Sequence, residues 1–219
     1  MAKDCFCALL LFFILTMDNQ NKKIQKKDAC RGCLRPLSQC ICEVVCPHSC
    51  TLSVCILQHP QETLKLLNSA RLCAMSISDA TLRTGLSWPN IHRAVGRQVT
   101  AANWAVLYLG PTHMVENHPV QILNRKMKPV GTECRLEGVI ALDGSWKQAK
   151  ALWWRNPWLL KLKRIQLNPQ KNSLRGQAKE AGLSTAEALA MVLEFTGNKS
   201  AAQSLMDNYT RLIIKPNLQ

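Results

Sequence analysis

Short apolar runs bounded by polar or turn residues recur along the chain and predict buried strands. Runs of four to eight apolar residues between turn signals are typical of parallel strands that are covered on both faces. The second run ends at Gly110-Pro111 and the third ends at Asp143-Gly144. Strands are therefore expected at 52–57, 104–109, 138–142 and 164–167.

Helical signals follow the first and the third predicted strands. Pro60 suits a first helical turn, and leucines at 64, 67 and 72 form an apolar stripe, so a helix is expected over 60–75. Ser145 can cap a second helix, which should run through Trp154 until Asn156-Pro157 stops it.

The C-terminal part carries a capping box. In Ser184-Thr-Ala-Glu187 the serine can accept from the N3 amide while the glutamate reaches back to the cap. This helix should run to about Phe195 and end at Gly197, and a last helix should cover 199–213. Strands that alternate with helices predict an α/β fold, a mostly parallel sheet with helices on both faces.

The first 29 residues differ from the rest. A 13-residue apolar run, 5–17, is too short for a comfortable membrane span. Asp4 and the absence of a small-residue cleavage site argue against a secretory signal. A leader added by a start upstream of Met17, a partner-binding or uncleaved helix, and export all stay open. We interpret 1–29 as a hydrophobic leader and flexible basic arm, and expect no stable membrane association.

Cysteines are numerous, and their odd count of 11 argues against a complete disulfide set. Four of them have the spacing C-x2-C-x6-C-x-C: Cys30, Cys33, Cys40 and Cys42. Four thiolates can close a tetrahedral zinc site of the structural kind. A pair of disulfides is the alternative, but the rest of the chain looks intracellular, which favours zinc. Cys46, His48 or Cys50 could supply a substitute ligand. The sequence thus predicts a cysteine-rich zinc knuckle over 30–50.

The net charge of +14 favours a polyanionic partner, nucleic acid first and anionic membrane second. Between Asp143 and Glu180 there are nine basic residues and no acidic one. Tryptophans at 146, 153, 154 and 158 lie among them. Cations neutralise phosphates, and indoles can stack on exposed bases. The alternative is a solvated basic helix face with tryptophans turned inward, and at least two of the four are expected in the core.

Asp143 lies where a predicted strand ends and a helix begins. Open α/β sheets bind ligands at the carboxyl ends of their strands. An aspartate that caps the helix from a turn is the alternative.

Several motifs stand in a specific order from about 30 to 195. The knuckle, with its Leu34-Arg-Pro36, is followed by Leu57-Gln-His-Pro-x-Glu62 and by Asn68-x-Ala-Arg-Leu72. Leu142-Asp-Gly-Ser-Trp146, then Asn156-Pro157, is similar to the Asp-x-Thr-Trp signature of the DTW-domain family. Leu183-Ser-Thr-x-Glu-Ala188 resembles the C-terminal motif of that family.

This resemblance implies a cytoplasmic tRNA-uridine aminocarboxypropyltransferase over 51–215. Such an enzyme transfers the 3-amino-3-carboxypropyl group of S-adenosylmethionine to N3 of a tRNA uridine and releases methylthioadenosine. It also implies a fold related to the SPOUT methyltransferases, with a C-terminal trefoil knot. Donor contacts are expected at Leu109, Gly110, Pro111, Leu142, Leu183, Ser184 and Thr185.

Asp143 is the candidate to take the N3 proton or to orient the uracil edge. Ser145 and Trp146 belong to the same signature, and the tryptophan is expected to pack or to stack. RNA contacts are expected at His59, Arg71, Lys147, Lys150, Arg155, Lys161, Arg164 and Arg175. For His59 and Arg71, the carboxylate of the donor is an alternative partner.

Two departures from the family pattern stand out. Ser145 replaces a threonine but keeps the hydroxyl, and 171–179 lacks the Tyr-Arg-x-Arg pattern, with Ser173 and Arg175 as its remnants. If this change has abolished the substrate contacts of the catalytic site, a non-catalytic zinc-containing RNA-binding protein is the alternative. A SPOUT-type RNA methyltransferase is the other.

Overall fold

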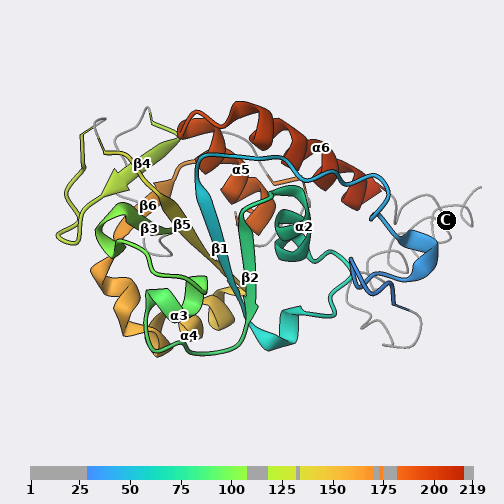
Figure 1. Cartoon of the computed structure of the whole chain (residues 1–219), viewed down its shortest axis with the longest axis horizontal. Coiled ribbons are helices and arrows are strands. Elements are labelled where there is room, and N and C mark those ends of the chain that lie inside the picture. Colours follow the sequence, from blue (N-terminus) through green and yellow to red (C-terminus); the bar gives the residue numbers. More distant parts are fainter. Residues whose placement is uncertain (1–28, 108–117, 132–133, 170–172, 175–181, 215–219) are drawn as a thin grey trace, which may run out of the picture.

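A six-stranded sheet forms the centre of the structure (Figure 1), a computed structural model that describes residues 29–107, 118–131, 134–169, 173–174 and 182–214. The strand order is β2-β1-β5-β3-β6-β4. The strands are β1 (Ser53–Gln58), β2 (Ala80–Thr84), β3 (Trp104–Leu107), β4 (Val120–Leu123), β5 (Gly138–Asp143) and β6 (Lys163–Leu167).

Parallel pairing dominates the sheet, and only the edge strand β4 runs antiparallel, against β6. The longest register joins β1 to β5, from Ser53 opposite Gly138 to Gln58 opposite Asp143. The carboxyl ends of β2, β1 and β5 therefore lie side by side. This is the edge at which open α/β sheets hold ligands.

Helices cover both faces of the sheet (Figure 1). The α-helices are α2 (Ser69–Ser76), α3 (Ile91–Val95), α4 (Trp146–Arg155), α5 (Thr185–Phe195) and α6 (Lys199–Ile214). The 3₁₀ turns are η3 (Leu37–Gln39), η4 (Pro60–Glu62), η5 (Ala101–Asn103) and η6 (Pro157–Lys161). Helices α2, α5 and α6 pack on one face, and α3 and α4 pack on the other.

Alternate residues of each strand enter different cores. In β1, Val54 and Ile56 join the core under α2, α5 and α6, whereas Cys55 and Leu57 join the core under α3 and α4. Successive side chains of a strand point to opposite faces, so a sheet covered on both sides needs apolar residues at every position. This explains the unbroken apolar runs in the sequence.

Most sequence-based elements are confirmed. The four expected strands correspond to β1, β3, β5 and β6, although 108 and 109 lie outside the described residues. The expected helices after Ser145 and Ser184 and the last helix correspond to α4, α5 and α6. Strands β2 and β4 and the short helix α3 were not expected; β2 is only half-buried and has no continuous apolar run.

The single helix expected over 60–75 is wrong. Only a 3₁₀ turn forms at its start, and α2 begins at Ser69. Asn68 is the physical reason. Its side-chain oxygen accepts from the Arg71 N–H at 2.9 Å, while its amide donates to the carbonyls of Glu62 and Thr63. An asparagine that binds nearby backbone groups in this way separates helical segments.

Two expectations concern parts that the structure does not describe. The trefoil knot stays a prediction, because the segments 170–172 and 175–181 that precede α5 lie outside the described residues. The hydrophobic leader and basic arm over 1–28 also lie outside them. Among the helices that the structure describes, none is long and apolar enough to span a bilayer.

We expect Gly138→Ala to destabilise the fold, because Gly138 lies against the buried Trp104. An added Cβ would lie 2.5 Å from the indole carbons, and overpacking of this kind costs about 1–3 kcal/mol. Urea unfolding measures the change. Gly131→Ala is the control: no atom lies within 4 Å of its Cβ position, so its effect should stay within about 0.5 kcal/mol. Equal stability of both variants would contradict the prediction.

Candidate functional site

Three polar residues end three neighbouring strands at the carboxyl edge of the sheet. They are Thr84 of β2, Gln58 of β1 and Asp143 of β5. The Gln58 amide donates to Asp143 Oδ2 at 3.0 Å, and its oxygen accepts from the Thr84 hydroxyl at 3.4 Å. Gln58 is fully buried and Asp143 is 8% exposed. The strand ends therefore hold one carboxylate in a fixed orientation.

The other oxygen of that carboxylate is held by α5. The Thr185 hydroxyl donates to Asp143 Oδ1 at 2.6 Å. Thr185 is the first residue of α5, and Ser184 caps the helix by accepting from the Glu187 N–H. Asp143 of the signature motif and Thr185 of the C-terminal motif, 42 residues apart in sequence, thus meet directly.

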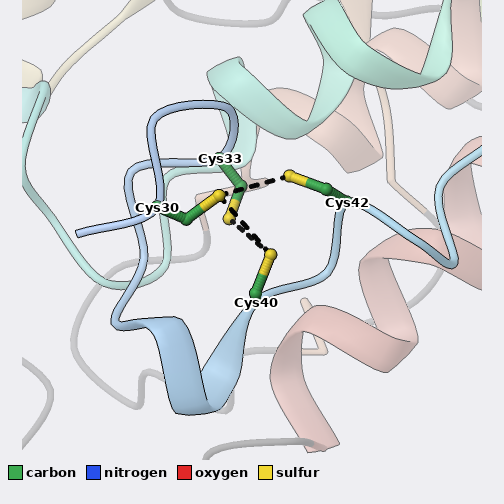
Figure 2. A group of neighbouring side chains, drawn as sticks. All are labelled: Cys30, Cys33, Cys40 and Cys42. Carbon is green, nitrogen blue, oxygen red and sulfur yellow. Dashed lines mark hydrogen bonds between the residues drawn. The ribbon is translucent and has the colours of Figure 1, made fainter. Parts of the chain in front are cut away.

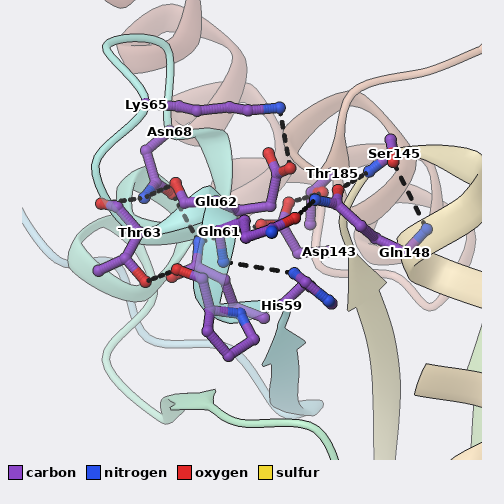
Figure 3. A network of polar contacts seen from close by, with 12 residues as sticks. His59, Gln61, Glu62, Thr63, Lys65, Asn68, Asp143, Ser145, Gln148 and Thr185 are labelled. Carbon is purple, nitrogen blue, oxygen red and sulfur yellow. Dashed lines mark hydrogen bonds and ion pairs between the residues drawn. The ribbon is translucent and has the colours of Figure 1, made fainter. Parts of the chain in front are cut away.

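A second polar network, shown in Figure 3, joins the start of α4 to η4. Gln148 closes a capping box with Ser145, accepting from the Ser145 N–H at 2.7 Å. The same side chain donates to Gln61 Oε1 at 3.0 Å. The His59 ring caps η4 by accepting from the Gln61 N–H at Nδ1, and the backbone N–H of His59 donates to the Asp143 carbonyl at 2.9 Å. These bonds fix the backbone from Asp143 to Ser145.

Glu187 binds the two described residues of the segment that departs from the family pattern. Its carboxylate is 6% exposed and accepts from the Ser184 N–H, from the Ser173 hydroxyl and from the Leu174 N–H, at 2.7 to 2.8 Å. Ser173, one of the two remnants of that pattern, is therefore bound to the N-terminus of α5. Arg175, the other remnant, lies outside the described residues.

The structure describes only some of the residues that are predicted to contact the donor. Leu142 is buried, Leu183 is half-buried before the cap, and Ser184 and Thr185 begin α5 beside Asp143. Leu109, Gly110 and Pro111 lie outside the described residues. Donor binding at all of these positions stays a prediction.

The predicted basic surface on α4 is present. Lys147, Lys150 and Arg155 are exposed, and so is Trp154, whose exposure is 73%. Residues 147, 150 and 154 follow an i, i+3, i+7 spacing, which places them on one side of a helix. This exposed side of α4 therefore combines two cations with an indole.

Of the four clustered tryptophans, two belong to the core, as expected. Trp153 and Trp158 are 9% exposed, whereas Trp146 is 45% exposed at the start of α4. The guanidinium of Arg164 lies 5.9 Å from the centre of the Trp153 ring. Arg164 thus takes part in packing, and RNA binding by this residue stays a prediction.

Arg71 contacts the knuckle. Its guanidinium donates to the Gly32 carbonyl at 2.9 Å, which ties α2 to the cysteine-rich segment. His59 is half-buried within η4, and Lys161 is exposed at the end of η6. Roles of these side chains in binding RNA or the donor stay predictions.

The four predicted metal ligands converge, as Figure 2 shows. Their sulfur atoms all lie within 4.8 Å of one another, and three pairs are 3.5 to 3.8 Å apart. Sulfurs on a tetrahedral ion at about 2.3 Å would be roughly 3.8 Å apart. All four cysteines are free thiols, so the disulfide alternative does not hold here. The cluster can hold a metal ion through Cys30, Cys33, Cys40 and Cys42.

The surroundings of the cluster shift the pKa values of its thiols in different directions. N–H groups of Cys33 and Gly32 lower the pKa of the Cys30 thiol to about 6, whereas burial raises the pKa of Cys42 to about 12. A side chain at position 32 would crowd the cluster, because a Cβ there would lie 2.8 Å from the Cys42 sulfur. Arg35, 2% exposed, donates to the Gln39 and Leu212 carbonyls beside the cluster.

Gln58, Thr84 and Asn68 were missed as site residues in the sequence. Gln58 Nε2 donates to Asn68 Oδ1 at 3.0 Å as well as to Asp143. The available signal was the same one that marked Asp143, a polar residue directly after a buried apolar run. Thr84 gave no such signal, because β2 was not expected.

Comparison with known proteins agrees with the motifs. The model of the DTW domain family matches residues 27–215. Similar proteins include tRNA-uridine aminocarboxypropyltransferase 2 of Drosophila melanogaster, 26% identical over 175 residues, which is 77% of this chain and 66% of the relative. The proteins of the same name from Mus musculus and Macaca fascicularis are 25% identical over 189 residues, 83% of this chain and 61% of each relative. The chain spans about two-thirds or less of these relatives. No solved structure gives a significant match.

We predict that the purified protein holds one metal ion per chain and that Cys42→Ser removes it. Because coordination free energy is also folding free energy, the variant should unfold several degrees lower, and a chelator should have the same effect on the unsubstituted chain. Elemental analysis and thermal unfolding provide the measurements. Cys46→Ser is the control, since Cys46 is exposed and outside the cluster. Full metal content in Cys42→Ser would contradict the assignment.

Proposed function

Because this chain belongs to the DTW domain family, we propose that it transfers the 3-amino-3-carboxypropyl group of S-adenosylmethionine to N3 of a uridine in tRNA. The names of its relatives support this reaction, and so does the positively charged, indole-bearing surface beside Asp143. A tRNA substrate fits the expected cytoplasmic location. We further propose the SPOUT-related knotted fold for 51–215, with the zinc knuckle at 30–50 as an appended structural unit.

The reaction requires a positioned base. Uridine N3 forms a bond to the methylene next to the sulfonium, the carbon–sulfur bond breaks with its electron pair going to sulfur, and the N3 proton must leave. Asp143 can take that proton or hold the N3–H edge. Gln58 and Thr185 fix both carboxylate oxygens, so the group needs little reorganisation during the reaction. This fixed carboxylate is the observation that carries the proposal.

Zinc is the metal we propose for the cysteine cluster. Four thiolates in a closed tetrahedral arrangement are typical of structural zinc and leave no position for a substrate. Cys30, Cys33, Cys40 and Cys42 would hold the ion, and its contribution would be to fold the knuckle against α2 and α6. Catalysis is then assigned to Asp143 and its neighbours alone.

Replacement of Asp143 by asparagine should abolish transfer while the protein still folds. General-base contributions are roughly a hundredfold or more, so we expect at least that loss of turnover with bulk tRNA and donor, measured as the mass of the released nucleosides. Asp207→Asn on α6 is the matched control, because Asp207 is exposed and far from the strand ends in sequence. Wild-type turnover in D143N would refute the role of Asp143. A methyl adduct in place of the heavier group would favour a methyltransferase.

Replacement of Trp154 by alanine should weaken tRNA binding about fivefold to a hundredfold, the range expected for loss of one stacked base. Trp154→Phe should keep most of the affinity, because a smaller aromatic ring still stacks. Phe195→Ala is the control, since Phe195 is an exposed aromatic residue, 49% exposed, on α5. Binding of a labelled tRNA, measured at one stated salt concentration, tests the prediction. Equal losses in W154A and F195A would contradict it.

A further inference from the structure

A basic cavity lies at the amino end of the sheet, away from Asp143. Its volume is about 460 Å³, and its lining residues are Ala102, Asn124, Arg125, Lys126, Lys161 and Lys163. Four of these six residues are cations and none is acidic. Like charges this close repel one another, and an anion in the cavity would relieve that repulsion.

The walls of the cavity are held by specific bonds. Arg125 Nε donates to the Lys161 carbonyl, and the Lys163 ammonium donates to the Ala102 carbonyl. Asn124 accepts from the Lys126 and Lys128 N–H groups and so closes the turn that carries Arg125 and Lys126. Arg125 and Lys126 therefore lie on a closed turn, and the side chains of Arg125 and Lys163 are held by backbone carbonyls.

The strand register gives the distance from the cavity to Asp143. Lys163 and Val139 both pair with Ala105, so they lie at the same level of the sheet. Asp143 is four residues further along β5, which corresponds to about 13 Å along the strand. Two strand spacings separate β6 from β5, about 10 Å across the sheet. The backbone of Lys163 in the cavity wall thus lies on the order of 16 Å from the backbone of Asp143, a separation that one tRNA can span.

The segment after Asp143 connects the two places. Helix α4 starts at the carboxyl end of β5, and η6 leads from its end to the start of β6 (Figure 1). Along it lie the exposed Lys147, Lys150 and Trp154, and then Lys161 in the cavity wall. The positive charge therefore continues from the site to the cavity.

We propose that this cavity is a second anion site, which binds a backbone phosphate of the same RNA whose uridine lies at Asp143. The inference rests on the proposed function for the identity of the RNA. Phosphate contacts position a nucleic acid without reading its sequence. The cavity would accordingly set the affinity and register of the substrate and take no part in the transfer itself.

The double variant K126Q/K161Q tests this site. Both side chains are exposed, and neither belongs to the catalytic network. We expect tRNA affinity to fall about threefold to thirtyfold, and the slope of log affinity against log salt to decrease by about one to two, since each phosphate contact contributes about 0.7–0.9 to the slope. Turnover at saturating tRNA should be unchanged while KM rises. Binding of S-adenosylmethionine should be unchanged.

The control is K199Q/R211Q, which removes the same charge from exposed positions of α6, on the other face of the sheet. Equal changes of affinity and slope in the two double variants would overturn the proposal. Loss of inorganic phosphate binding in K126Q/K161Q with unchanged tRNA binding would also overturn it, because the cavity would then be a free-phosphate site. If the unsubstituted chain binds tRNA but transfers nothing, the proposed function fails and this site is still tested by binding.

Discussion

The parallel pairing of β1 with β5 is the constraint on which the site depends. Its register places Gln58 opposite Asp143 at the last pair of the two strands. A buried amide is stable only when its donors and acceptors are bonded, and Gln58 meets this condition through Asp143, Asn68 and Thr84. A slip by one residue would turn the core side chains of β1 to the opposite face. The packing of both cores thus fixes the position of the carboxylate.

From this pairing, hydrogen bonds lead to the cysteine cluster. Gln58 donates to both Asp143 and Asn68, Asn68 accepts from the Arg71 N–H, and the Arg71 guanidinium donates to the Gly32 carbonyl between the first two cysteines. The knuckle is therefore attached to the site through the N-terminus of α2. A structural metal ion would in this way support the geometry around Asp143 without contacting a substrate.

The sequence predicted what local patterns encode. Apolar runs gave the central strands, and the capping boxes at Ser145 and Ser184 gave the starts of α4 and α5. Local patterns could not show that Thr185 reaches Asp143, because that contact depends on the packing of α5 against the end of β5. The break at Asn68 was missed because apolar periodicity continues across it, while a side chain that bonds to its own backbone decides the outcome.

The departure from the family pattern before α5 is best understood through Glu187. Its carboxylate completes the capping box with Ser184 and also accepts from Ser173 and Leu174. Thr185, held in place by the same cap, donates to Asp143. One helix N-terminus therefore orients the proposed base and binds Ser173 and Leu174 of the altered segment. Although the tyrosine and arginine pattern is missing, Ser173 and Leu174 are bound to the same helix N-terminus that holds Asp143, which is consistent with the proposed role of that carboxylate.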